Sequence, residues 1–218
     1  MRFDSMKLAL LIPILILLSA FIIDHSIEEK EKEWNKIYGI IGVAYDILKI
    51  ENGYLVTGRC QPEEKEYFDA FLLKIDKNGN EIWNRTYGGW GEEVGKKIIE
   101  TVDGYIICGY TLSYGNGESD FWVVKVDKNG NEIWNRTYGG SRTDFGMDII
   151  KTNDNGYMIV GETESFDLEG DAWVVKLDEN GNEIWNKAYG SRGKWDYASS
   201  VLETDDGYLI SGLTSSYG

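Results

Sequence analysis

Short apolar segments separated by glycine-containing turns recur along most of this chain. In FDAFLLKID, apolar residues point to both faces of an expected strand, Phe71 and Ile75 to one and Leu72 to the other. DFWVVKVD and DAWVVKLD repeat the pattern further along. A strand that is apolar on both faces must be covered on both, as happens when sheets stack face to face.

Each apolar segment runs into a turn and then into a tryptophan-bearing segment. DKNGNEIWNRTYGG begins at Asp76 and recurs letter for letter from Asp127, and DENGNEIWNKAYG begins at Asp178. The tryptophans of these segments and of EWNKIYG lie 49, 51 and 51 residues apart, at Trp34, Trp83, Trp134 and Trp185. The chain is therefore a tandem array with a period of about fifty residues.

Two further strands precede each apolar segment and meet at a turn. The turn pairs are Asn52-Gly53, Asp103-Gly104, Asn155-Gly156 and Asp206-Gly207. Such pairs favour two-residue hairpins in which both turn residues have positive φ. First strands are expected at 44–50, 95–101, 146–152 and 198–204, and second strands at 54–59, 105–110, 157–162 and 208–213.

Four antiparallel strands per repeat, each sheet covered by the next, predict an all-β, β-propeller-type array over residues 33–218. We expect three complete blades (43–87, 94–138 and 145–189), a partial blade (197–218) and a lone fourth strand starting at Glu33. The last blade has no third strand, so the array should be an incomplete ring. Its exposed faces would pair with a second copy or with further blades; a truncated gene product is the alternative.

The N-terminal residues 1–24 predict a signal peptide or a membrane anchor containing a hydrophobic helix. Arg2 and Lys7 precede an uncharged run over residues 8–23, which as a helix would be about 24 Å long. Cleavage after Ala20 would put Leu18 where a small residue is preferred, so an anchor is favoured over secretion. The flanking charges put the repeats outside the cell, after a charged spacer at 25–32.

The net charge of −15 is spread through every repeat and argues against a nucleic-acid partner. Cys60 and Cys108 occupy non-equivalent positions in second strands, which predicts two buried thiols and no disulfide. The sole histidine, His25, lies in the spacer, so catalytic schemes based on histidine are excluded within the repeats. The sequence therefore favours a protein that is not an enzyme.

Carboxylates stand just before three of the first strands, at Glu93, Asp144 and Asp196, and Gly42 breaks the series. In a propeller they could ring the mouth of a central channel and attract a cation. The favoured alternative is that they form local hydrogen bonds that fix the turn.

Aromatic residues occupy loops that differ between repeats. Trp90, Phe145 and Trp195 are expected in the loops between blades, and Tyr114 and Phe166 in the other variable loops. Variable loops on a constant scaffold are where recognition is usually found. We expect this group, together with the three carboxylates, to bind a protein or a carbohydrate outside the cell, with packing beneath the loops as the alternative.

Two further patterns suggest modification or metal binding. Asn84 and Asn135 begin Asn-Arg-Thr sequons for glycosylation on the expected outermost strands. The Asp-Xaa-Asn-Gly-Asn-Glu turns resemble calcium loops, but their glycine is fourth and a tryptophan follows, unlike an EF-hand. A metal-free hairpin turn is favoured, with calcium as the alternative and no other cofactor expected.

The repeat resembles the propeller repeats of archaeal and bacterial surface proteins, whose period is also about fifty residues. The matching segments are Asp103 to Ile106, Gly109 to Thr111 and Asp120 to Trp134. A weaker likeness, carried by Asp127, Gly130 and Trp134, is to the tryptophan-docking motif of quinoprotein dehydrogenases, with one residue fewer between Asp and Gly. The first resemblance implies an architecture without a particular activity, and the second leaves a quinoprotein-like enzyme fragment as the alternative to a binding or scaffold module.

Overall fold

All regular elements of the computed structural model, which describes residues 35–166 and 169–216, are β-strands. The first sheet comprises β1 (Gly42–Ile50), β2 (Gly53–Cys60), β3 (Asp69–Asp76) and β4 (Glu81–Tyr87). The second comprises β5 (Glu93–Glu100), β6 (Gly104–Thr111), β7 (Asp120–Asp127) and β8 (Glu132–Tyr138). The third comprises β9 (Asp144–Lys151), β10 (Tyr157–Thr163), β11 (Asp171–Leu177) and β12 (Glu183–Tyr189), and the fourth β13 (Asp196–Thr204) and β14 (Gly207–Thr214).

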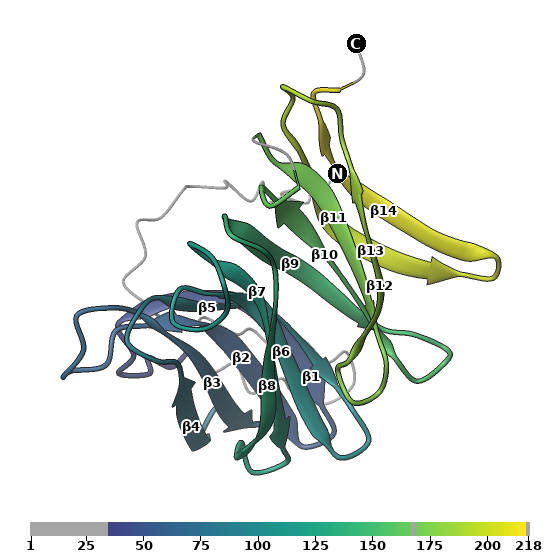
Figure 1. Ribbon diagram of the computed structural model, residues 1–218. Helices are drawn as coiled ribbons and strands as arrows, with labels where there is room; N and C mark the ends of the chain where they lie inside the picture. Colours follow the sequence, from purple (N-terminus) through teal and green to yellow (C-terminus); the bar gives the residue numbers. More distant parts are fainter. Residues whose placement is uncertain (1–34, 167–168, 217–218) are drawn as a thin grey trace, which may run out of the picture.

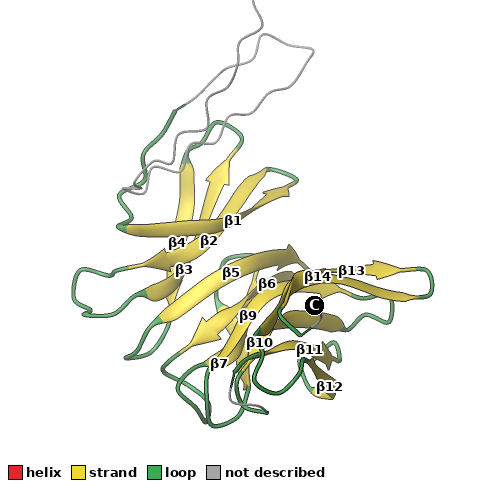
Figure 2. Ribbon diagram, turned by 90° about the horizontal axis from the view of Figure 1, so that it is seen from above, coloured by secondary structure: helices red, strands yellow, loops and turns green. Residues whose placement is uncertain are grey.

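Within every sheet the strands are antiparallel and follow one another in chain order. Each sheet contacts the next through its first strand, from β1 to β5, β5 to β9 and β9 to β13. The sheets follow one another from the purple to the yellow end of the chain (Figure 1), and Figure 2 shows that they do not close into a ring. The predicted all-β array of four-stranded sheets and its incompleteness are confirmed, and the arrangement is propeller-like.

Separate hydrophobic cores lie between successive sheets. Leu72 of β3 and Trp122 of β7 belong to the core between the first and second sheets. Phe121 and Val123, the neighbours of Trp122, face the core between the second and third sheets. Because neighbouring side chains of a strand point to opposite faces, each third strand contributes to two cores. The prediction that these strands are covered on both faces is confirmed.

The repeated tryptophan and tyrosine of β4 and β8 fasten these strands to the following sheet. A Cβ atom on Gly130 would lie 3.0 Å from the ring of Trp83, so the ring rests directly on this glycine. The hydroxyl of Tyr87 donates a hydrogen bond of 2.7 Å to the carbonyl oxygen of Gly130. Trp134 and Tyr138 meet Gly181 in the same way, with a hydrogen bond of 2.6 Å. The near-identical turn sequences therefore serve contacts between sheets as well as the turns themselves.

The expected lone strand EWNKIYG, residues 33–39, is not formed over its described part, residues 35–39. Strands β4, β8 and β12 each hydrogen-bond to the third strand of their own sheet, whereas no described strand offers such a ladder to this segment. Its tyrosine is nevertheless placed as in the repeats, because the hydroxyl of Tyr38 donates to the carbonyl oxygen of Gly79 at 2.9 Å.

The expectations for residues 1–24 and the spacer at 25–32 fall outside the described residues, as do Glu33 and Trp34. Within the described part of the chain, no helix is long and apolar enough to span a membrane. Cys60 and Cys108 are both buried and free, which confirms the prediction for the thiols.

The hairpins between first and second strands form where predicted, but their turn geometry differs. Ile50 pairs with Gly53 and Thr204 with Gly207, so these turns lie one residue earlier than expected. Among the described turn pairs, positive φ occurs only at Asn155 (66°) and Gly53 (149°), so the expectation of two such residues in each turn is wrong.

Close packing explains the turn glycines better than turn conformation does. A Cβ atom on Gly104 would lie 1.8 Å from the carbonyl oxygen of Val126 in the third strand, and one on Gly53 would lie 1.9 Å from that of Ile75. Real Cβ atoms do not approach oxygen so closely, so the neighbouring strand requires glycine at these positions. A Cβ atom on Gly207 would have no atom within 4 Å.

Candidate functional site

The variable loops of neighbouring repeats meet at one end of the sheets, here called the loop end. It comprises residues 61–68, 88–92, 112–119, 139–143, 164–166, 169–170 and 190–195. The loop between β4 and β5 touches the loop that follows β6, since the Gly91 N–H donates to Ser113 Oγ at 2.7 Å. The Arg142 N–H donates to Ser165 Oγ at 3.3 Å, one repeat later. Recurring contacts therefore hold residues of varied sequence on a regular frame.

The three aligned carboxylates lie buried beneath the loop end. Glu93 accepts hydrogen bonds from Thr111 Oγ1 (2.7 Å), Ser113 N–H (3.1 Å) and Gly89 N–H (2.8 Å). Asp144 accepts from Gly140 N–H (2.9 Å) and Ser165 Oγ (2.8 Å).

Asp196 follows the same pattern in the fourth sheet. It accepts from the Ser215 N–H at 3.1 Å and from the Ser216 hydroxyl. Each of the three carboxylates therefore ties together the loops beside it. This geometry supports local hydrogen bonding in preference to an open ring of negative charge.

A second carboxylate faces the first across a glycine in each of these three clusters. A Cβ atom on Gly139 would lie 2.1 Å from Asp120 Oδ1 and 2.5 Å from Asp144 Oδ2. A Cβ atom on Gly88 would lie 2.5 Å from Asp69 Oδ1 and 2.3 Å from Glu93 Oε2. A Cβ atom on Gly190 would lie 1.8 Å from Asp171 Oδ1 and 3.0 Å from Asp196 Oδ2. Sequence reasoning missed Asp69, Asp120 and Asp171, although each begins a third strand at the same place in the repeat.

The pairs across Gly88 and Gly139 differ in how their charge is compensated. Lys65 Nζ lies 2.9 and 2.7 Å from the two oxygens of Asp69. Asp120 instead accepts a hydrogen bond of 3.0 Å from the main-chain N–H of Asn116. Burial, and to a lesser degree the negative charge of Asp144, raise the pKa of Asp120 above the usual value for aspartate. Asp144 Oδ1 is also buried and has no hydrogen-bond partner.

We expect Asp120→Asn to make the protein more stable at neutral pH. Because the pKa of Asp120 is higher in the folded than in the unfolded protein, ionised Asp120 destabilises the folded state. This destabilisation is absent below the unfolded pKa and reaches its full value once the pH has risen through the folded pKa. An asparagine still accepts the Asn116 N–H and brings no charge near Asp144. The free energy of unfolding from denaturant titrations across acid and neutral pH measures the effect, and the advantage of the variant should vanish in acid.

Asp69→Asn is the matched control, because it weakens a charge-assisted contact with Lys65 and should lower stability at neutral pH. Equal effects of the two substitutions would contradict this view of the two pairs.

The predicted loop aromatics divide into exposed and packed residues. Trp90 is 82% exposed at the tip of the loop between β4 and β5. Trp195 is about half exposed, and its indole N–H donates to Glu162. Phe145 lies within β9 and not in the loop, with its ring 4.6 Å from that of Tyr110.

Two other loop aromatics cover buried tryptophans. The ring of Tyr114 stacks on that of Trp122 at a centroid distance of 6.2 Å, and Phe166 contacts Trp173 at 5.7 Å. Of the predicted group, Trp90 is the most exposed, followed by Phe166 and Trp195.

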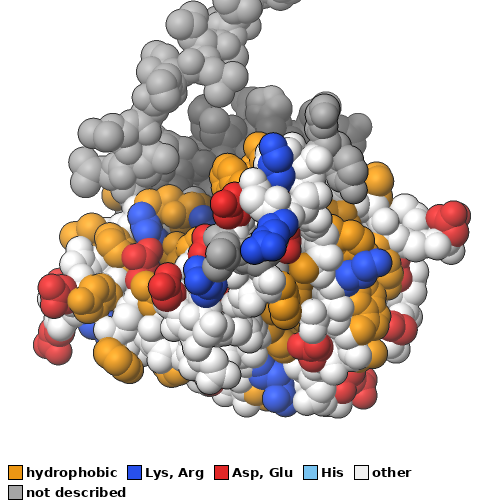
Figure 3. All heavy atoms as spheres, turned by 45° about the horizontal axis from the view of Figure 1, so that its top comes forward, with side chains coloured by type: hydrophobic (Ala, Val, Ile, Leu, Met, Phe, Trp, Pro, Cys, Tyr) orange, Lys and Arg blue, Asp and Glu red, His pale blue; other side chains and the backbone are white. Residues whose placement is uncertain are grey.

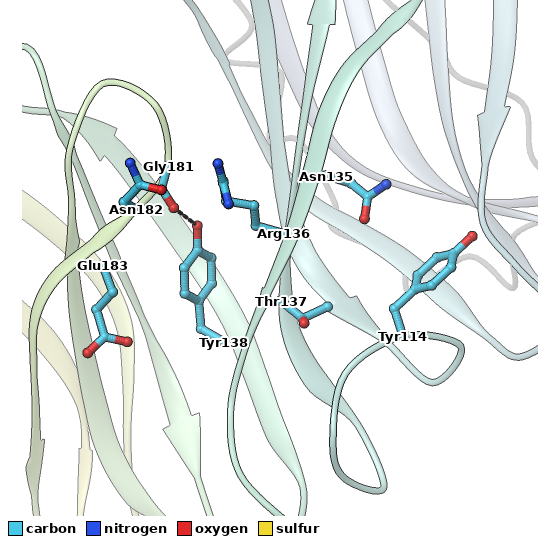
Figure 4. Close-up of a pocket in the computed structure, with 8 residues that line it drawn as sticks. All are labelled: Tyr114, Asn135, Arg136, Thr137, Tyr138, Gly181, Asn182 and Glu183. Atoms are coloured by element: carbon cyan, nitrogen blue, oxygen red, sulfur yellow. Dashed lines mark hydrogen bonds between the residues drawn. The ribbon is translucent and has the colours of Figure 1, made fainter.

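Asn84 and Asn135 are exposed on β4 and β8. Asn135 borders an open groove of about 470 Å³ between the second and third sheets (Figure 4), where the Tyr138 hydroxyl reaches the Gly181 carbonyl. The groove is lined by Tyr114, Asn135, Arg136, Thr137, Tyr138, Gly181, Asn182 and Glu183. Both sequon asparagines are thus placed where a glycan would meet solvent, and glycosylation stays a prediction.

The turns that resemble calcium loops are organised by hydrogen bonds. Asp76 Oδ1 accepts the N–H groups of Asn78 and Asn80, each at 2.8 Å, and Asp76 Oδ2 accepts the Asn80 amide at 2.8 Å. Gly79 supplies the positive φ, 74°, that closes the turn. Asp127 and Asp178 repeat the arrangement. The hairpin interpretation therefore accounts for the pattern of oxygens that recurs in each repeat.

On the face shown in Figure 3, hydrophobic side chains are interspersed with both acidic and basic groups. Among residues 35–166 and 169–216, no group of three or more His, Cys, Asp or Glu side chains is arranged to hold a metal ion. Comparison with protein-family models and with curated protein sequences finds no significant match.

Proposed function

We propose that this protein is a non-enzymatic, β-propeller-type binding or scaffold module that acts outside the cell. The repeated sheets form a constant frame, and the loops that differ between repeats gather at one end of it. Such a division is typical of scaffolds that carry recognition on their loops. An extracytoplasmic place is supported by the cationic start and apolar run of the N-terminal sequence.

The exposure of Trp90 is the observation that carries this proposal. A tryptophan is costly to leave in water, and on binding surfaces it supplies a large contact area with few rotatable bonds. Gly89 and Gly91 flank it, and the loop is held by hydrogen bonds from Gly89 N–H to Glu93 and from Gly91 N–H to Ser113. The indole is therefore presented to solvent from a positioned loop.

Site-specific photo-crosslinking in the cells that make the protein tests this assignment. A photoreactive phenylalanine replaces Trp90 in the full-length chain, and Val102 provides the matched control position. Val102 is 90% exposed but lies beyond the opposite end of β5. We expect a defined adduct from position 90 and none from position 102. Digestion of the adduct with protease or glycosidase distinguishes a protein from a carbohydrate. No adduct at position 90, or the same adduct at both positions, would contradict the proposal.

The alternative of a quinoprotein-like enzyme fragment has no specific support beyond the tryptophan-docking likeness. Its residues Gly130 and Trp134 take part in packing between successive sheets, with Gly130 under Trp83 and Trp134 over Gly181. A structural role thus accounts for the motif without a cofactor.

A further inference from the structure

The fourth sheet lacks, among the described residues, the partner that its second strand has in every other sheet. Strands β2, β6 and β10 each pair on both edges, whereas β14 pairs only with β13. Leu209 of β14 is 64% exposed, although its counterpart Ile106 of β6 is fully buried. In Figure 1, β14 forms the outer boundary of the array. An exposed apolar strand edge of this kind is a template for pairing with another strand.

Gly207 indicates which kind of strand fits this edge. Its counterparts Gly53, Gly104 and Gly156 each lie where a Cβ atom would meet a carbonyl oxygen of the third strand, at 1.9, 1.8 and 2.2 Å. Nothing lies within 4 Å of the same position on Gly207. The fourth sheet thus has the space that a third strand occupies elsewhere.

The outer strand of the third sheet, β12, likewise has side chains without the contacts that their counterparts make. Tyr87 and Tyr138 are 7% and 8% exposed, because each donates its hydroxyl to the turn glycine of the next sheet's third and fourth strands. Tyr189 is their counterpart and is 47% exposed. Trp185, the counterpart of Trp83 and Trp134, is also exposed. Both side chains are placed for a turn glycine that no described residue supplies.

We propose that β12 and β14 together form an acceptor site for a β-hairpin of the third-and-fourth-strand type. The partner is a protein segment with the pattern of residues 120–140, carried by another chain that contains such repeats. Its first strand pairs with β14 beside Gly207. Its turn glycine lies under the ring of Trp185 and accepts a hydrogen bond from the Tyr189 hydroxyl. The same contacts already join the first to the second sheet and the second to the third.

This inference concerns the end of the array, and the proposed function concerns the loop end. Trp90 is not part of the acceptor site, so a failed crosslink at position 90 leaves hairpin binding untouched. A failure of hairpin binding likewise leaves recognition through the loops untouched.

Fluorescence anisotropy of a labelled synthetic peptide, residues 120–140, tests the acceptor site on the full-length chain. We expect saturable binding to the unaltered protein. Gly207→Ala should weaken binding by about tenfold or more, because its Cβ would occupy the position of the incoming carbonyl. The same substitution should leave the protein's own stability unchanged, since the space around Gly207 is open. Tyr189→Phe should weaken binding by several-fold through loss of one hydrogen bond.

A peptide with Val124→Pro is the control for strand pairing, because proline removes an N–H from the ladder. This peptide should not bind. The proposal is overturned if the unaltered peptide shows no binding up to about 1 mM, or if Gly207→Ala and the proline peptide both bind as well as their parents.

Discussion

Replacing Trp122 by alanine is expected to lower the free energy of unfolding by about 3–5 kcal/mol. Trp122 is 1% exposed and lies in the core between the first and second sheets, where it contacts residues of both. Its removal leaves a cavity that the ladders on either side of β7 cannot collapse to fill. Equilibrium unfolding in denaturant, followed by far-ultraviolet circular dichroism, measures the loss.

Phenylalanine at the same position provides a finer comparison with the next repeat. The indole N–H of Trp122 is buried without a hydrogen-bond partner, so Trp122→Phe removes an unsatisfied donor along with some volume. The indole of its counterpart, Trp173, donates to Asn186 at 3.2 Å. We expect Trp173→Phe to cost about 1 kcal/mol more than Trp122→Phe. The opposite order would show that the two cores are packed differently from this description.

Replacing Gly104 by alanine is expected to cost about 3 kcal/mol or more, because the new methyl group would meet the Val126 carbonyl oxygen at 1.8 Å. Either β6 and β7 must separate or their hydrogen-bond ladder must break. Gly207→Ala is the matched control at the equivalent position of the fourth sheet, and it should change stability by no more than about 0.5 kcal/mol. The thermal unfolding midpoints of both variants, compared with that of the unaltered protein, measure the two losses of stability. Similar losses would mean that both glycines serve the turn itself and not the neighbouring strand.

The strands could be predicted from the sequence because the same pattern of apolar segments and glycine-containing turns occurs three times. Residues 69–76 are apolar on both faces, and turn glycines separate successive strands; both features can be read from a short stretch of sequence. The period of the repeat then gave the number of sheets. The lone strand predicted from Glu33 does not form over residues 35–39, because a strand also needs a neighbouring strand to pair with, and that neighbour is not encoded in the segment itself. The predicted turn geometry was wrong because these glycines are required by close packing against a third strand, about twenty residues further along the chain.

The candidate site could be predicted only in part for the same reason. Glu93 and Asp144 could be aligned from the repeat, but their pairing with Asp69 and Asp120 depends on contacts across Gly88 and Gly139. Single exposed side chains were no easier to foresee. Nothing in the sequence distinguishes the projecting Trp90 from Tyr114, which stacks on Trp122.

Hydrogen–deuterium exchange of the full-length chain, with and without the 120–140 peptide, tests most directly whether β12 and β14 form an acceptor end. In the free protein, amides of β14 should exchange much faster than those of β6, which has a ladder on both edges. Addition of the peptide should slow exchange in β14 and leave β6 unchanged. Protection of β14 equal to that of β6 without peptide, or no change in β14 when the peptide is present in excess, would contradict the account.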